Sequence, residues 1–275
     1  MSGPTLKIVL LAMLLVGACA TSEDSKQVTY SLTAKQNYEQ GLEELKNENY
    51  AEATNFFTYV KQKFSFSKYA ALAELGLADT EFARGAYQEA IDDYKTFQRL
   101  HPTHEKVVDG YIAFRVAECN VKEMPDDWII LPPAYEKDQS AVRDALRELD
   151  NLLAKYPKST YVNQARAYRR IVVGRLIDHE VYVARFYLDR GHPKAAILRI
   201  ETALRRYPDS GQEGDLLLAL GETHLEMGRP ASAKRAFLRI VNDYQQEIPR
   251  ERARLFLEYI ERRFGSDPVD HPVDG

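Results

Sequence analysis

The residues of this sequence that could react or hold a metal do not form a convincing site. His101 and His104 flank a proline, so their imidazole rings do not share a helix face, and no cysteine lies near them to complete a metal site. The triplet Asp178-His179-Glu180 falls at a predicted helix junction, where such side chains cap helices or face solvent. Motifs for nucleotide phosphates, serine hydrolases and zinc proteases are absent. The sequence therefore predicts no catalytic residue, no metal and no bound cofactor.

Cys19 is the residue for which the sequence predicts covalent chemistry. It follows an apolar run, residues 8–16, which is too short to span a bilayer and is typical of a secretory signal. The ending Val16-Gly17-Ala18-Cys19 resembles the bacterial lipobox. This resemblance implies cleavage before Cys19 and its modification by diacylglycerol and a further acyl chain such as palmitate. An ordinary signal peptide cut near Ala18 or Ala20, with Cys19 incidental, is the alternative.

The same region indicates where the protein resides. Residues 1–18 are the predicted signal peptide, and residues 19–33 are the lipidated cysteine and a polar, flexible tether. Ala20, rather than an aspartate, follows Cys19, and by resemblance to the sorting rule of many Gram-negative bacteria this predicts the outer membrane, on its periplasmic face. The formal net charge of −4 argues against nucleic acid as a partner. Cys119 has no cysteine partner once Cys19 is modified, and its apolar neighbours predict a buried thiol.

From residue 34 onward the sequence is predicted to be helical, with an internal repeat of about 34 residues. Apolar helical runs end before Pro102, Pro157 and Pro208, and small residues recur where two antiparallel helices would cross. This pattern is typical of tetratricopeptide (TPR) repeats. We therefore expect an all-α solenoid of about five helix-turn-helix units, with a concave surface lined by the first helix of each unit. The positions that fit the template are Gly41, Ala53 and Phe57; Ala78, Ala90 and Tyr94; Ala184, Ala196 and Ile200; and Gly221, Ala233 and Phe237.

The predicted repeats divide into two blocks. N-terminal units cover residues 34–122 and C-terminal units cover residues 141–263, with a proline-rich insertion at 123–140 between them. We expect Trp128-Ile-Ile-Leu131 in this insertion to pack on the domain rather than to contact a partner. Two successive helices, about 160–179 and 180–190, are expected to link the middle unit to the next. Residues 264–275 lack apolar periodicity and are predicted to be a disordered tail.

The lipobox, the tether and the repeats together resemble the BamD (ComL/YfiO) family of outer-membrane lipoproteins. The resemblance extends over nearly the whole mature chain and is most specific in "KDQSAVRDALRELDNLLAKYPKSTYVNQA" and "EVYVARFYLDRGHPKAAILRIETALRRYPDS". It implies a non-enzymatic periplasmic scaffold of the β-barrel assembly (BAM) machinery. In that role the C-terminal repeats would bind the barrel-forming (BamA-like) subunit, the N-terminal repeats would receive unfolded outer membrane proteins, and other BAM lipoproteins would also bind.

The resemblance also implies binding residues. Arg199 matches an arginine that the family uses at its interface with the barrel-forming subunit, and a guanidinium suits a carboxylate there because it binds bidentately. Arg205 and Glu201 complete the predicted partner-binding set, while an exposed Arg199 that supports its neighbour Glu201 is the alternative. The predicted groove for aromatic-rich substrate segments consists of Tyr38, Tyr59, Phe64, Phe66, Tyr69 and Tyr111, although core packing is the alternative role of each.

Two other functions fit parts of the sequence. A TPR lipoprotein could pilot a secretin or pilus, or assist cell-envelope division, and it would then co-purify with a partner such as a secretin. A periplasmic enzyme such as a murein hydrolase could carry the repeats as an accessory, but the sequence shows no separate catalytic domain.

Overall fold

A computed structural model describes residues 28–125 and 132–270 of the chain. The predicted signal peptide, Cys19 with most of its tether, and Trp128-Ile-Ile-Leu131 lie outside these described residues. Within them the chain forms α-helices and a short 3-10 helix, with no strand. The elements are α1 (Ala34–Lys46), α2 (Tyr50–Lys63), α3 (Lys68–Ala83), α4 (Tyr87–Leu100), α5 (Glu105–Val108), α6 (Tyr111–Lys122), the 3-10 helix η1 (Ala134–Glu136), α7 (Ser140–Lys155), α8 (Val162–Asp189), α9 (Pro193–Arg206), α10 (Glu213–Glu226), α11 (Pro230–Asp243) and α12 (Glu247–Phe264).

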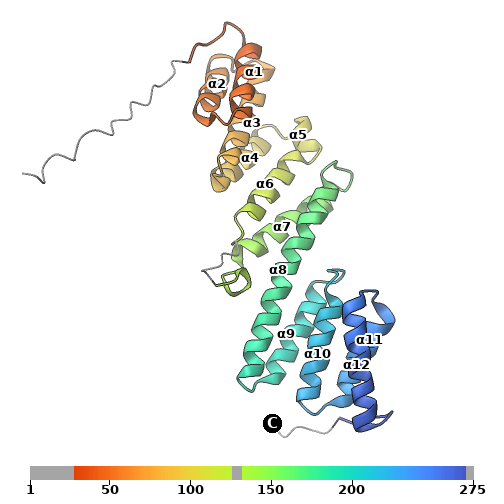
Figure 1. The fold of residues 1–275 in the computed structure, drawn as a ribbon. Helices are drawn as coiled ribbons and strands as arrows, with labels where there is room; N and C mark the ends of the chain where they lie inside the picture. The colour runs from red at the N-terminus through yellow and green to blue at the C-terminus, as the bar shows by residue number, and fades with distance from the viewer. Residues whose placement is uncertain (1–27, 126–131, 271–275) are drawn as a thin grey trace, which may run out of the picture.

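The helices pair as consecutive antiparallel hairpins (Figure 1). The pairs are α1 with α2, α3 with α4, α6 with α7, α8 with α9, and α10 with α11, and each pair packs on the next. The short α5 precedes α6, and α12 packs on α11 and α10. The described chain is therefore an elongated, all-α TPR-type solenoid, which confirms the predicted fold class.

Small residues allow the two helices of a hairpin to cross closely. A Cβ added to Gly221 of α10 would lie 2.4 Å from Cε1 of Phe237 on α11, and one added to Gly41 of α1 would lie 2.7 Å from Cε1 of Phe57 on α2. Carbon atoms in favourable contact are about 3.5–4.0 Å apart, and both phenylalanines are fully buried. The first and last hairpins thus cross through the same pair of residue types, glycine against phenylalanine, as the repeat pattern predicted.

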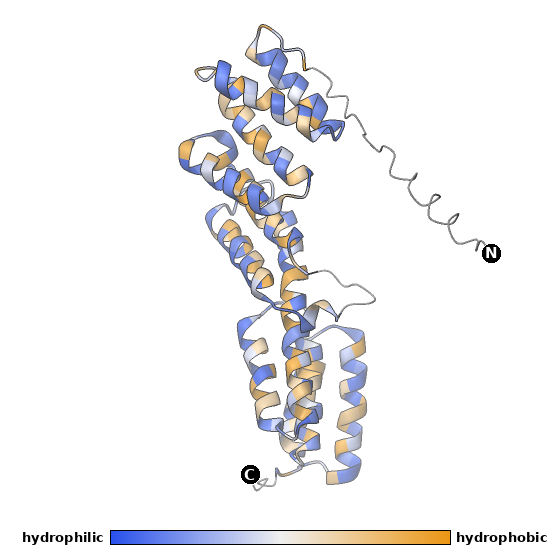
Figure 2. Cartoon of the chain, turned by 90° about the vertical axis from the view of Figure 1, so that its left-hand side faces the viewer, coloured by the Kyte–Doolittle hydropathy of each residue, from blue (hydrophilic) through white to orange (hydrophobic). Residues whose placement is uncertain are grey.

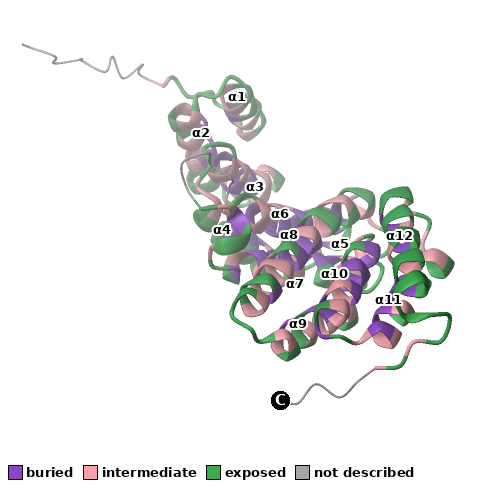
Figure 3. Cartoon of the chain, turned by 60° about the horizontal axis from the view of Figure 1, so that its bottom comes forward, coloured by how far each residue is buried: buried purple, intermediate pink, exposed green. Residues whose placement is uncertain are grey.

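Apolar helix faces meet inside the stack. Figure 2 shows hydrophobic and hydrophilic residues interspersed around most helices, and Figure 3 shows buried residues on the sides that face neighbouring helices. The largest buried cluster joins α6, α7, α8, α9 and α10 and contains Leu149, Val172 and Ala196. Because each hairpin buries its apolar faces against adjacent hairpins, the solenoid is stabilised by neighbour contacts along its length.

Residues 162–189 form one continuous 28-residue helix, α8, so the prediction of two successive helices is wrong. No proline interrupts this stretch, and the buried side chains Val173, Leu176 and Ile177 continue the apolar face up to the predicted break. The triplet Asp178-His179-Glu180 therefore lies inside a helix and caps no junction. Figure 1 shows α8 running from the middle hairpin to α9, with which it forms the next hairpin as its first helix.

The described flanks of the proline-rich insertion pack on α8. Nδ1 of His179 lies 2.6 Å from the carbonyl oxygen of Tyr135, and the rings of Tyr135 and Tyr182 are 5.5 Å apart. The guanidinium of Arg175 donates a hydrogen bond to the carbonyl oxygen of Pro125. Polar groups of α8 thus satisfy backbone carbonyls on both sides of the insertion, which fixes its two ends to the same helix.

The segment after α12 packs on α11 at residue 270, so this part of the predicted tail has defined contacts, while residues 271–275 lie outside the described residues. The carboxylate of Asp270 accepts hydrogen bonds from the backbone N–H groups of Ala231 (2.8 Å) and Ser232 (3.1 Å). These N–H groups belong to the first turn of α11, where no partner is available within the helix. Asp270 therefore caps α11 from outside that helix. Such a contact needs no apolar periodicity in the capping segment, so the sequence pattern did not indicate it.

Candidate partner-binding surfaces

Three of the six aromatic residues predicted to form a substrate groove lie on first helices of their units. The ring centroids of Tyr38 on α1 and Tyr69 on α3 are 5.7 Å apart. Tyr111, at the start of α6, donates a hydrogen bond from its hydroxyl to Asp79 of α3 at 2.8 Å. All three tyrosines are half-buried. We call Tyr38, Tyr69 and Tyr111 the aromatic face, because these residues are the part of the predicted groove that the structure brings onto adjacent first helices.

The other three aromatic residues lie elsewhere. Tyr59 is on α2, the second helix of its hairpin, and its ring is 5.9 Å from that of Phe64, which ends α2. Tyr30 stacks on Tyr59 with centroids 4.0 Å apart. Phe66, in the α2–α3 connection, is fully exposed and has no aromatic neighbour among the described residues. The structure therefore places these three residues off the first helices of their units, and their contact with a substrate stays a prediction.

A polar network beside the aromatic face joins α3, α4 and α6. Oδ1 of Asp79 on α3 accepts hydrogen bonds from the hydroxyls of Tyr94 on α4 (2.5 Å) and Tyr111 on α6 (2.8 Å). Nε of Arg115 on α6 donates to the Tyr94 hydroxyl at 3.0 Å and lies 3.7 Å from Oδ1 of Asp79. The guanidinium also lies 3.5 Å from the centroid of the Phe82 ring.

This network extends to α8 and keeps its protons at neutral pH. Arg115 donates to Glu118 at 2.7 Å, and Glu118 accepts a hydrogen bond from the hydroxyl of Tyr168 on α8 at 2.9 Å. Burial and then the nearby Asp79 raise the pKa of Tyr94 and of Tyr111 far above the ordinary value, so both hydroxyls remain donors. The network therefore fixes the second hairpin, α3–α4, to the middle of the solenoid.

Arg199 belongs to a surface of paired arginines, which we call the arginine surface, formed by α7, α8 and α9. A cavity of about 340 Å³ between these helices is lined by Arg143, Arg147, Arg169 and Arg206 among others. Arg199 lies seven residues before Arg206 and hence on the same side of α9. The ion pairs are Arg143 with Asp138 (3.8 Å), Arg147 with Asp144 (2.7 Å), Arg169 with Asp150 (2.6 Å) and Arg199 with Glu180 (3.5 Å).

Arg205 and Glu201 face a different side of α9 from Arg199. Their side chains are 3.6 Å apart, with that of Arg205 64% exposed and that of Glu201 43% exposed. Residues 199 and 205 are six positions apart, which separates them by about 120° around a helix. The structure therefore divides the predicted partner-binding set into Arg199, on the arginine surface, and a separate Glu201–Arg205 pair.

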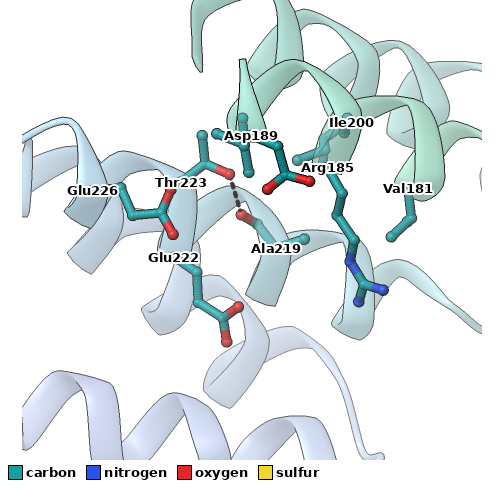
Figure 4. Close-up of a pocket in the computed structure, with 10 residues that line it drawn as sticks. Val181, Arg185, Asp189, Ile200, Ala219, Glu222, Thr223 and Glu226 are labelled. Atoms are coloured by element: carbon teal, nitrogen blue, oxygen red, sulfur yellow. Dashed lines mark hydrogen bonds between the residues drawn. The ribbon is translucent and has the colours of Figure 1, made fainter. Parts of the chain in front are cut away.

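A second cavity, of about 300 Å³, opens between α8, α9 and α10 (Figure 4). Glu222 in its lining accepts a hydrogen bond from Arg252 of α12 at 2.7 Å. Asp189 and Glu226 also line it, and neither forms a hydrogen bond or ion pair with any described residue. The apolar part of the lining includes Val181, Ala184, Leu188, Ile200 and Ala219. Arg185 also lines the hollow, so its walls combine apolar side chains with charges of both signs.

The residues with reactive potential have structural contacts. Nε2 of His101 lies 2.8 Å from Oε2 of Glu74, and Nδ1 of His104 accepts a hydrogen bond from the Lys106 N–H, which caps α5. Across residues 28–125 and 132–270, no three His, Cys, Asp or Glu side chains are placed to hold a metal ion. Cys119 is fully buried, as predicted, and burial raises its pKa to about 12. Its thiol is therefore protonated and shielded at neutral pH.

The helices in the described ranges are all too short or too polar to cross a bilayer.

Sequence reasoning missed the polar network and the arginine surface. Asp79 is separated by 15 residues from Tyr94 and by 32 from Tyr111, so no local motif connects them. One available signal was composition, because 17 tyrosines in a helical chain need hydroxyl partners when they are buried. A second signal was the run of Arg and Asp residues through α7, whose i,i+3 pairs the helical spacing predicts.

Comparisons with known proteins identify a family model and relatives that match most of this chain. A family model described as "YfiO: Outer membrane lipoprotein" matches residues 31–239. A Caulobacter vibrioides protein named outer membrane protein assembly factor BamD is 26% identical over 231 residues, which cover 84% of this chain and 72% of that protein. A protein of the same name from Neisseria meningitidis serogroup A is 25% identical over 229 residues, with 80% and 84% covered. A thermophilic TPR protein of Thermus thermophilus, of solved structure, is 17% identical, covers 82% of this chain and all of that one, and has a TM-score of 0.36, too low to carry an argument.

Proposed function

Because this chain belongs to the YfiO family of outer membrane lipoproteins, we propose that it is a periplasmic scaffold, anchored to the outer membrane, that helps to fold and insert β-barrel proteins. The observation that carries the proposal is the family match over residues 31–239, which extends from the start of α1 into α11. Relatives that align with most of this chain are named outer membrane protein assembly factors. The role is one of binding, requires no reaction, and needs no cofactor beyond a lipid on Cys19.

The C-terminal repeats are the proposed site for the barrel-forming subunit of the machinery. The arginine surface supports this assignment, because Arg199 is 44% exposed and its bond to Glu180 is long, at 3.5 Å. A partner carboxylate could therefore replace Glu180 without breaking a short ion pair. In this proposal the Glu201–Arg205 pair is a second contact, on another side of α9. That side is available to bind further lipoproteins of the machinery.

The contribution of each side of α9 can be separated by charge reversal. Arg199→Glu should weaken co-purification of the barrel-forming subunit by at least about tenfold, since it places like charges in the interface. Arg239→Glu, at an exposed position of α11, is the matched control, because Arg239 pairs only loosely with Asp243 at 3.9 Å. If Arg205→Glu abolishes co-purification of the barrel-forming subunit and Arg199→Glu does not, the interface lies on the other side of α9.

The N-terminal repeats are the proposed site for unfolded outer membrane proteins. The aromatic face supports this, since Tyr38, Tyr69 and Tyr111 lie along first helices and retain exposed surface. Aromatic side chains of an extended substrate segment would pack against these rings. Tyr38→Ala with Tyr69→Ala should reduce crosslinking of an unfolded barrel protein, whereas Tyr87→Ala on α4 should not.

The function as a whole is tested by depletion. Removing the protein from its host should lower the amounts of several β-barrel proteins in the outer membrane, while outer-membrane lipoproteins serve as the control. Unchanged barrel levels together with loss of one secretin would instead favour the role of a secretin pilot.

A further inference from the structure

The end of the first hairpin exposes two large apolar side chains. Leu32 is 96% exposed and Phe66 is fully exposed, which makes them the most exposed large hydrophobic residues of the described chain. Leu32 precedes α1, and Phe66 lies between the end of α2 and the start of α3. Antiparallel packing brings these three helix ends together, at one end of the elongated stack (Figure 1). We call residues 30–32 and 61–68 the α1–α2 tip.

The tip is held by packed rings. Tyr30 stacks on Tyr59 with an interplanar angle of 10° and meets Phe56 edge-on at 5.6 Å. Tyr59 in turn contacts Phe64 edge-on at 5.9 Å. The chain that arrives from the N-terminus is therefore fixed to α2 at Tyr30. Leu32 and Phe66 project from a packed base, so their exposure is not that of a free chain end.

The tip is also basic in a protein that is acidic as a whole. The tip with its flanking residues, 28–38 and 59–69, contains four lysines and no aspartate or glutamate, against a net charge of −4 for the chain. Lys35 and Lys61 reach Glu39 (3.6 Å) and Glu74 (3.9 Å) outside these stretches. Lys63 and Lys68 form no ion pair with any described residue, and Lys68 lies 5.3 Å from the centroid of the Tyr69 ring. The tip thus combines tyrosines, exposed apolar side chains and unpaired lysines.

We propose that the α1–α2 tip docks on the phospholipid surface to which the protein is anchored, as a second membrane contact made by the folded chain. The proposal rests on the lipid at Cys19 in the proposed function. Tyr30 lies eleven positions after Cys19, so it stays within about 40 Å of the anchor even when the intervening chain is fully extended. At that effective concentration a weak surface contact is populated.

The chemistry of the tip matches a lipid–water interface. Tyrosine and phenylalanine rings favour the headgroup level of a bilayer, and lysines are attracted to anionic headgroups. A lipid on Cys19 limits how far the chain can lie from the membrane, and contact by the tip also sets the orientation of the chain. Contact by the tip fixes the first hairpin at the membrane, so that the solenoid extends away from it and carries the arginine surface into the periplasm.

The first experiment locates the tip relative to lipid in the full-length, lipidated protein. An environment-sensitive fluorophore is attached at Ser65→Cys, with Cys119 protected by burial, and the protein is reconstituted in phosphatidylethanolamine vesicles with about a quarter phosphatidylglycerol and nitroxide-labelled lipid. Glu251→Cys, exposed on α12 near the other end of the stack, is the matched position. We expect strong quenching at residue 65 and little at residue 251. Equal quenching at the two positions would overturn the proposal.

The second experiment measures the contact without the anchor. The mature chain with Cys19→Ser should bind the same vesicles weakly and less at high salt. Combining Leu32→Ser with Phe66→Ser should lower its partition by roughly tenfold per side chain, whereas Ile248→Ser with Leu255→Ser, at exposed positions of α12, should not. Matching unfolding midpoints of both double variants show that folding is intact. Absence of vesicle binding by the parent chain would overturn the proposal.

Other occupants of the tip would give different results. The probe at Ser65→Cys could be shielded only when an unfolded barrel protein is added, or only at concentrations where the chain self-associates. Either result would also overturn the lipid contact. These readouts are independent of barrel assembly. A host with normal barrel levels after depletion would refute the proposed function and leave the lipid quenching unchanged.

Discussion

Gly221→Ala should destabilise the protein although alanine is the better helix former. The added Cβ would lie 2.4, 2.5 and 2.9 Å from Cε1, Cζ and Cδ1 of Phe237. Favourable carbon contacts need about 3.5–4.0 Å, so α10 and the ring must separate by about 1 Å. The ring cannot retreat easily, because Phe237 is fully buried and stacked on Phe256 at 4.8 Å.

The expected size of the effect follows from two opposing contributions. Overpacking of a core costs about 1–3 kcal/mol, and replacing glycine by alanine inside a helix returns about 1 kcal/mol. We therefore expect the free energy of unfolding to fall by up to about 2 kcal/mol, and the melting temperature by up to about 8 °C. Gly174→Ala in α8 is the matched control, since its Cβ would meet only the amide end of Gln212 at 3.3 Å. That variant should be neutral or up to about 1 kcal/mol more stable.

The assay is urea unfolding followed by circular dichroism, applied to both variants and to Phe237→Leu alone and combined with Gly221→Ala. The smaller leucine relieves the clash, so the two substitutions should show a coupling energy of about 1 kcal/mol or more in the double-mutant cycle. Equal stability of Gly221→Ala and Gly174→Ala, or additive effects in the cycle, would refute the account of how these helices cross.

Three further predictions concern buried groups. Tyr94→Phe should cost about 1–3 kcal/mol in urea unfolding, because it removes a hydroxyl hydrogen-bonded to both Asp79 and Arg115; an unchanged midpoint would mean that the network does not stabilise the joint. Cys119, whose pKa burial raises to about 12, should react with a thiol reagent in Cys19→Ser protein only as fast as the chain unfolds, and prompt labelling would contradict its burial. Burial and then Arg229 lower the pKa of His224 below its usual 6.5. The unfolded state therefore binds the proton first, so stability should fall as pH drops below about 6.5, and His224→Gln should flatten that loss.

The repeat architecture was predictable because its determinants are local and periodic. Glycine and alanine at crossing positions, such as Gly41 and Ala53, together with aromatic partners, such as Phe57, specify a helix hairpin wherever it occurs in the chain. Cys119 was predicted correctly for the same reason, since the apolar face of its helix is visible in the sequence. Such features depend on helical spacing alone.

The features that were not predicted depend on contacts between distant segments. The cap on α11 comes from Asp270, 38 residues after Ser232, and the continuity of α8 depends on packing against hairpins on both sides of the predicted break. The six aromatic residues of the predicted groove were grouped by type, yet Tyr59 and Tyr38 lie on opposite helices of one hairpin. Which face of a solenoid a side chain occupies is decided by its helix, so residue type alone could not assign the groove.

The central claim is that this chain is a lipid-anchored scaffold of the barrel-assembly machinery, and the most direct measurement is to identify its partners. The lipidated protein would be purified from detergent-solubilised outer membranes, with bound proteins identified by mass spectrometry for the parent chain, Arg199→Glu and Arg239→Glu. The account predicts that the barrel-forming subunit co-purifies with the parent and Arg239→Glu and is depleted with Arg199→Glu. The account would be contradicted if a secretin co-purified in place of the barrel-forming subunit. It would also be contradicted if none of the three proteins retained a barrel-assembly subunit.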